Sequence, residues 1–156
     1  MKFELKKCAW SQNDPPEVDV ELTYDESGTV AKMTSHSFPK RATVTQNQGR
    51  VWEDDCLEFF YEKDDGYVNL EANSLGALRQ SFGKERNGRE LIRYASVEIE
   101  MTDDGWRAIF KTPDIAQKGN FYACADLADK PYYASWSEIK TPEADFHRPE
   151  FFEKFN

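Results

Sequence analysis

Carboxylate, amide and guanidinium side chains gather in one stretch of the chain, between two tryptophans. Trp52 and Trp136 flank this stretch, and its polar side chains include Glu58, Asn69, Glu71, Asn73 and Arg79. A pyranose ring has apolar C–H faces that stack on an indole and a rim of hydroxyls that needs donors and acceptors. Charged groups make stronger hydrogen bonds to hydroxyls than neutral groups do. These residue types therefore predict a surface that suits sugars.

Three consecutive segments, residues 56–62, 67–73 and 78–82, would position these polar side chains. Each alternates apolar and polar residues, which is typical of a strand with one buried face and one solvated face. The short links between them, such as the turn at 63–66, favour a meander in one sheet. With the apolar residues toward the core, the other face displays Cys56, Glu58, Phe60, Tyr67, Asn69, Glu71, Asn73, Arg79 and Ser81. A shift of one residue in any strand would scatter them.

The rest of the chain also consists of short alternating runs separated by turn residues. Further strands are predicted at 17–23, 29–35, 93–101, 106–110, 121–127 and 132–137. We expect mostly loop at 37–48 and 83–89, one short helical turn within 112–118, and an aromatic tail at 145–152 that caps the sandwich. Many short strands without a long amphipathic helix predict an all-β fold, an antiparallel β-sandwich of the jelly-roll or immunoglobulin-like type, in one domain over residues 1–156.

Charge and composition exclude several classes of function. The 156-residue chain has a formal net charge of −9, so it lacks the basic face that nucleic acids or anionic membranes require. No apolar run approaches the length of a membrane span, and the first residues lack the apolar region of a secretory signal. Three scattered cysteines are too few for a disulfide framework or a zinc cluster, and we expect reduced, buried thiols. These features favour the cytoplasm.

Several ordered motifs connect the chain to a known family. They are Trp52-x-x-Asp55-x-x-Glu58-Phe59-Phe60, Gly66-Tyr67-x-Asn69-x-Glu71-x-Asn73-x-x-Gly76, Trp106-x-x-x-Phe110, Asn120-Phe121-Tyr122-x-Cys124-x-Asp126, Ser135-Trp136 and the tail at 145–152. In this order and combination, from about Trp52 to the end, the chain resembles the family 9 carbohydrate-binding modules and their single-domain relatives.

The resemblance implies a jelly-roll-like β-sandwich that holds a mono- or oligosaccharide in a slot between two aromatic side chains. Trp52 corresponds to the first wall of the slot and Trp136 to the second. Glu58 and Arg79 correspond to the groups that bind sugar hydroxyls, and Asn69, Glu71 and Asn73 would line the floor. Well-studied modules of this family also hold calcium, but no cofactor is assigned here. The candidate ligands are ordinary turn residues: Asp54, Asp64, Asp65, Asp103 and Asp104.

Other interpretations of the same residues remain open. Glu58 and Glu71 on neighbouring strands suit the carboxyl pair of a glycoside hydrolase, although an open slot would not raise the pKa of either acid. A haem-binding relative would need axial ligands, and only His36 and His147 are available as histidines. An acidic face could also serve a protein partner. In the plainest interpretation, the tryptophans are core residues and Glu58–Arg79 is a surface ion pair.

Overall fold

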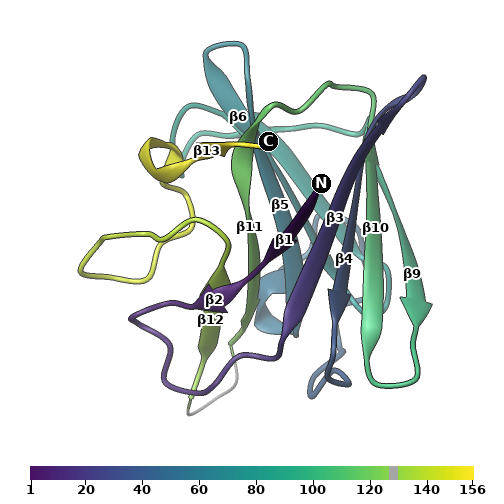
Figure 1. Ribbon diagram of the computed structural model, residues 1–156, viewed down its shortest axis with the longest axis vertical. Helices are drawn as coiled ribbons and strands as arrows, with labels where there is room; N and C mark the ends of the chain where they lie inside the picture. The colour runs from purple at the N-terminus through teal and green to yellow at the C-terminus, as the bar shows by residue number, and fades with distance from the viewer. Residues whose placement is uncertain (127–129) are drawn as a thin grey trace.

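The computed structural model describes residues 1–126 and 130–156, and two antiparallel β-sheets make up nearly all of its regular structure (Figure 1). The elements are β1 (Lys2–Glu4), β2 (Lys6–Lys7), β3 (Val18–Asp25), β4 (Gly28–Ser35), η1 (Val51–Glu53), β5 (Cys56–Lys63), β6 (Gly66–Asn73), β7 (Leu78–Gly83), β8 (Glu90–Leu91), β9 (Ser96–Met101), β10 (Trp106–Thr112), β11 (Lys118–Ala125), β12 (Tyr132–Ser135), η2 (Pro149–Phe151) and β13 (Glu153–Lys154). The predicted all-β sandwich is confirmed.

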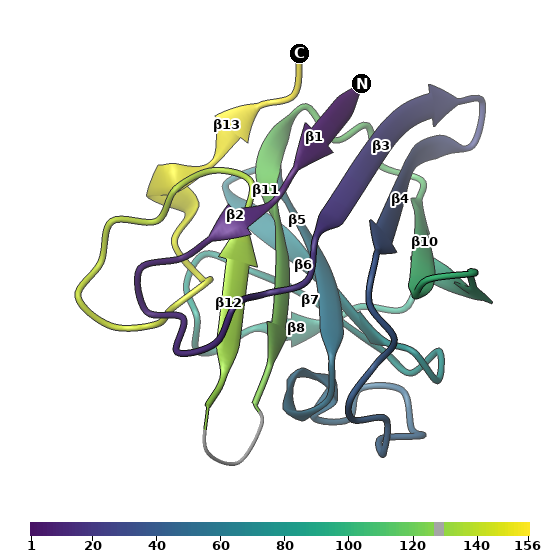
Figure 2. The same cartoon turned by 60° about the horizontal axis from the view of Figure 1, so that its bottom comes forward.

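The two sheets have no strand in common, and consecutive strands connect them at one edge. The smaller sheet has the order β1-β3-β4-β10-β9, and the larger has the order β2-β12-β11-β5-β6-β7-β8, with β13 added beside β11. At one edge β1 in the first sheet leads directly into β2 in the second, as Figure 2 shows. The predicted meander of the three polar segments is confirmed as β5-β6-β7.

The main core lies between the sheets and is formed by the predicted apolar residues. Phe59, Leu70, Phe110 and Phe121 are fully buried there, and Trp106 is 2% exposed. The side chains at successive even or odd positions of each strand point into this core, as the period of two requires. The phenyl rings of Phe59 and Phe121 stack across β5 and β11 with centroids 5.1 Å apart.

The outer face of the larger sheet is also covered, although the sequence predicted a solvated face. A second apolar cluster forms there from strand residues such as Phe60, Tyr67 and Tyr122 and from loop residues such as Val51 and Phe146. The covering segments have no periodic pattern, because they are irregular chain and not strands. The outer face is therefore largely covered, and the pocket described below opens onto it.

The predicted helical turn within 112–118 is wrong. This segment bends between β10 and β11, and its backbone is bonded to Thr29 on β4: the Thr29 hydroxyl donates to the carbonyl of Asp114, and the N–H of Ala116 donates to the same hydroxyl. Backbone groups that are bonded across the sandwich are not available for a local helical turn. The mostly-loop predictions hold, and Leu127 of the predicted strand 121–127 lies outside the described residues. The strands β1, β2, β8 and β13 were not predicted.

An ionic clamp on the smaller sheet makes stability depend on pH. His36 contacts the carboxylates of Asp19 and Asp104 at 2.6 and 2.8 Å, and these hydrogen bonds raise its pKa above 6.5. A raised folded-state pKa gives stability that is present below the unfolded value and is lost as pH rises through the folded value. Because the partners are exposed, we expect at most about 1 kcal/mol. Chemical denaturation of the wild type and His36→Asn should show a stability difference that shrinks from acidic to alkaline pH, and a constant difference would contradict the clamp.

Candidate functional site

The register of the larger sheet places the predicted polar side chains in adjacent rows. Glu58 on β5 lies opposite Glu71 on β6, which lies opposite Arg79 on β7. In the next row, Asn69 lies between Phe60 and Ser81. The predicted alignment across the three strands is confirmed, and Glu58, Asn69, Glu71 and Arg79 share one face.

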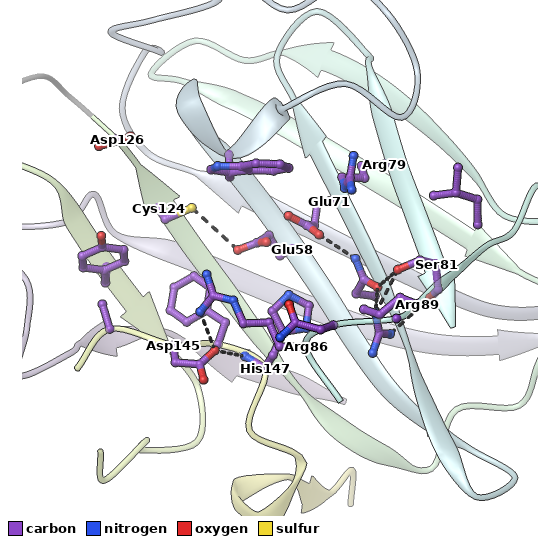
Figure 3. A pocket seen from close by; sticks show the side chains of 18 residues that line it. Glu58, Glu71, Arg79, Ser81, Arg86, Arg89, Cys124, Asp126, Asp145 and His147 are labelled. Carbon is purple, nitrogen blue, oxygen red and sulfur yellow. Dashed lines mark hydrogen bonds and ion pairs between the residues drawn. The ribbon is translucent and has the colours of Figure 1, made fainter. Parts of the chain in front are cut away.

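This face opens into a pocket of about 530 Å³ that is bounded by three irregular segments. The floor is formed by the strands and the walls by η1, the loop before β8 and the C-terminal tail. Figure 3 shows Glu58 and Glu71 side by side, with Cys124 next to Glu58 and with Arg86, Asp145 and His147 across from them. The lining residues are Trp52, Glu58, Asn69, Glu71, Arg79, Ser81, Arg86, Asn87, Gly88, Arg89, Leu91, Cys124, Asp126, Tyr133, Ala144, Asp145, Phe146 and His147.

Trp52 supplies a half-buried indole at one wall. It sits on the short 3-10 helix η1, directly before β5, and packs against the second apolar cluster. The guanidinium of Arg79 lies 5.1 Å from the centre of the indole ring, and that of Arg50 lies 5.6 Å from it. Arg79 also donates from Nη1 to the carbonyl of Gln48 at 2.7 Å. The indole and one guanidinium are thus fixed together beside the two glutamates.

The two glutamates on the floor are almost inaccessible from outside. Glu58 is 3% exposed and Glu71 is 5% exposed. Burial, followed by the neighbouring Cys124 and the Glu71 carboxylate, raises the pKa of Glu58 well above its usual 4.5. The Cys124 thiol donates a weak hydrogen bond to Glu58 at 3.6 Å, and Asn69 donates to Glu71. Glu58 therefore holds its proton more tightly than an ordinary carboxyl does, and in its protonated form it can donate as well as accept.

A second arginine, Arg89, braces the floor from the loop before β8. Its guanidinium lies 4.0 Å from the centre of the Tyr67 ring and donates to Asn69 and Ser81 at 3.0 Å and to the Tyr67 carbonyl at 2.7 Å. These bonds hold the Asn69 amide in place. The sequence analysis did not find Arg89, because the loop 83–89 has no periodic pattern that could assign it to a face.

The C-terminal tail forms the opposite wall. Asp145 pairs with Arg86 at 3.1 Å and accepts from the N–H of His147, while Phe146 stacks on Tyr122 with ring centroids 4.3 Å apart. His147 Nδ1 is 2.8 Å from the Tyr67 hydroxyl. Burial, together with the nearby arginines, lowers the pKa of His147 to about 4, so its imidazole is neutral at physiological pH. The tail was predicted to be a cap, and its part in the pocket was not.

Comparison with known proteins agrees with this architecture. The family model described as carbohydrate-binding family 9 matches residues 1–110 and 106–156. The chain belongs to carbohydrate-binding family 9. A crystal structure of a candidate carbohydrate-binding protein from Bacteroides uniformis ATCC 8492 is similar, with 26% sequence identity and a TM-score of 0.84. The match covers 99% of this chain and 84% of that chain. Among proteins with curated descriptions, no match was found.

Trp136 of this family 9 domain does not face Trp52, contrary to the predicted two-tryptophan slot. Its indole packs against Phe3, Phe121 and Phe155 with ring centroids 4.7, 6.1 and 5.7 Å away, on the inner face of the larger sheet. Alternation explains the difference, because Trp136 follows Tyr132 and Ala134, which both point into the core. Tyr133 has the opposite parity, and its ring lines the pocket with Trp52.

Asn73 was predicted to lie on the floor, but it acts as a brace at the end of β6. Its side-chain amide donates to the Val44 carbonyl at 2.7 Å and to Asp54 at 3.0 Å. Its side-chain oxygen accepts from the N–H groups of Leu75 and Ala77. Asn73 is fully buried and does not line the pocket, because all its polar atoms are used to fix the surrounding loops.

Two of the candidate calcium ligands, Asp54 and Asp65, have protein partners in the family 9 domain. Asp54 is buried among backbone donors, and Asp65 pairs with Lys84 at 2.9 Å. Within residues 1–126 and 130–156, no group of three or more histidine, cysteine or acidic side chains is placed to hold a metal ion. The three cysteines are free and buried. In the same part of the chain, no helix has the length and apolar character to cross a membrane.

Proposed function

We propose that this domain binds a mono- or oligosaccharide in the pocket beside Trp52 and does not cleave it. The observation that carries the proposal is the combination, in a chain of carbohydrate-binding family 9, of one half-buried indole with Glu58, Glu71 and Arg79 around a single opening. The apolar face of a sugar ring would pack against Trp52, with Tyr133 as a further aromatic surface of the lining.

The polar groups supply what the hydroxyl rim requires. The Arg79 guanidinium offers donors, Glu71 offers acceptors, and Asn69 is held by its neighbours in a fixed orientation. Pre-oriented polar groups lose little conformational entropy when a ligand binds. Each contact contributes modestly, so we expect dissociation constants of about 1 µM to 1 mM.

Titration of neutral mono- and oligosaccharides by calorimetry and tryptophan fluorescence tests the proposal. Trp52→Ala should weaken binding by about tenfold or more, because it removes the stacking surface and the partner of Arg79. Trp136→Phe is the control: it keeps a ring in the core and should leave the affinity unchanged. Absence of binding across a broad panel, or equal losses in the two variants, would overturn the proposed site. Release of reducing sugar during the same incubations would overturn its non-catalytic part.

A further inference from the structure

The two floor glutamates are closer than their register alone indicates. The N–H of Asn73 donates to Ala77, on the side of β7, so the odd-numbered residues of β6 direct their backbone groups away from β5. Glu58 and Glu71 therefore form a pair without mutual backbone hydrogen bonds. In such antiparallel pairs the Cα atoms are about 4.5 Å apart and the side chains lie closer than in the other type of pair.

The cations nearest this pair direct their hydrogen bonds to other groups, although Arg89 is close enough to interact electrostatically with Glu71. Arg79 is in register with Glu71, but its guanidinium lies over Trp52 and bonds to Gln48. Arg89 is occupied by Tyr67, Asn69 and Ser81. Arg86 pairs with Asp145 on the far wall. Within the described parts of the chain, no ion pair reaches either glutamate.

The remaining titratable neighbours do not compensate the charge either. Cys124 faces Glu58 from β11, and Cys56 lies two residues before Glu58 on the same face of β5. Both are buried thiols. The neutral His147 faces the pair from the tail, and the Tyr122 phenol from β11 bonds to Phe146. The acidic groups elsewhere in the lining are Asp126 and Asp145. Burial and mutual repulsion therefore oppose the presence of two negative charges on this pair.

We propose that Glu58 and Glu71 share one proton and together recognise two adjacent hydroxyls of an uncharged sugar, so that binding fails when alkaline pH removes this proton. This inference rests on the proposed carbohydrate binding and identifies the ligand class as a neutral sugar with a vicinal diol. The protonated carboxyl donates to one hydroxyl, and the ionised carboxyl accepts from the next. With both carboxyls ionised, the floor has no donor and the two charges repel each other.

The shared proton is tested first without any sugar, by ¹³C NMR of the side-chain carboxyls of uniformly labelled protein. The Glu58 signal is assigned by its loss in Glu58→Gln, and that of Glu71 by its loss in Glu71→Gln. We expect one protonated carboxyl in the pair at about pH 7, which ionises only at alkaline pH. Full ionisation of both carboxyls by about pH 5 would overturn the proposal.

The role in recognition is tested with the tightest-binding neutral sugar of the panel, at about pH 7 and about pH 10. The wild type should lose affinity by about tenfold or more at the higher pH, whereas Glu58→Gln, whose amide donates at every pH, should show a flat profile. Glu62→Gln is the matched control, because Glu62 is an exposed residue of the same strand that pairs with Lys118, and it should follow the wild type.

The outcomes separate the two proposals. A flat wild-type profile, or an equal fall in Glu58→Gln, would overturn the role of the proton while leaving carbohydrate binding intact. A panel without any binding sugar would overturn both the carbohydrate proposal and the recognition role, whereas the NMR titration would still establish whether the pair shares a proton.

Discussion

Asp54→Ala should lower the free energy of unfolding by about 3 to 5 kcal/mol, a large part of the stability of a domain this size. The Asp54 side chain is fully buried at the base of η1. Its carboxylate accepts from the N–H groups of Thr43 and Val44, the Thr43 hydroxyl, the Asn73 amide and, at 3.4 Å, Arg41. Alanine would remove the shared acceptor of the buried Asn73 amide and of the part-buried Thr43 and Val44 groups, so the loss exceeds that of a single hydrogen bond.

The same substitution should also change the response to acid. Burial alone would raise the pKa of Asp54, but the hydrogen bonds from Val44 and Thr43 outweigh burial and lower it from 3.8. A lowered folded-state pKa gives stability that is present above the unfolded value and is lost as pH falls through the folded value. The difference between the wild type and Asp54→Ala in urea denaturation should therefore shrink at the acidic end. Asp65→Ala is the control, since Asp65 is exposed and its ion pair with Lys84 is screened by water, and it should leave the stability nearly unchanged. A comparable loss in the two variants would contradict the argument.

Phe121→Ala should cost about 3 to 5 kcal/mol through loss of packing. The Phe121 ring is fully buried, with the rings of Phe3, Phe59 and Phe155 at centroid distances of 5.2, 5.1 and 5.2 Å. β11 lies in the middle of the larger sheet, between β12 and β5, so the cavity cannot close without moving three strands. Thermal and urea denaturation measure the loss.

A milder substitution covers the case in which Phe121→Ala does not fold. Phe121→Leu keeps most of the volume and should lose about 1 to 2 kcal/mol, with unchanged sugar affinity because the side chain is on the inner face. The control is Phe38→Ala: the Phe38 side chain is 54% exposed, and its loss should change stability by about 0.5 kcal/mol or less. A loss below about 1 kcal/mol in Phe121→Ala would contradict the packing argument.

Alternation predicted the floor of the site because a strand has only two faces. Once the apolar residues of β5, β6 and β7 are turned inward, Glu58, Glu71 and Arg79 must lie on the other side, and the short links fix the register. The same rule assigns Trp136 to the core and Tyr133 to the pocket, since Tyr132 and Ala134 point inward. The family resemblance assigned Trp136 to the pocket, whereas the structure places Tyr133 in the lining and Trp136 on the other face of the sheet.

The walls could not be predicted in this way. Arg89, Asp145 and His147 lie on irregular chain, where the direction of a side chain depends on contacts that are distant in sequence, such as Arg86 with Asp145. Asn73 shows that alternation can give the correct face and still not predict the role of a side chain. It has the correct parity for the floor, but the strand ends there and its amide turns to the loops around Asp54. Parity thus assigns a side chain to a face, and tertiary contacts determine its partners.

Because the tail forms one wall of the pocket, the site is completed late in the folding of a newly synthesised domain. Residues 58–81 form the floor, whereas Phe146 and His147 are synthesised after them and cover Tyr122 and Tyr67. A nascent chain that has paired its strands would still expose those aromatic rings to water and to other chains. Ligand affinity would therefore report that the tail at 145–152 has docked. Before then, chaperones would bind the apolar rings that the sheet still exposes.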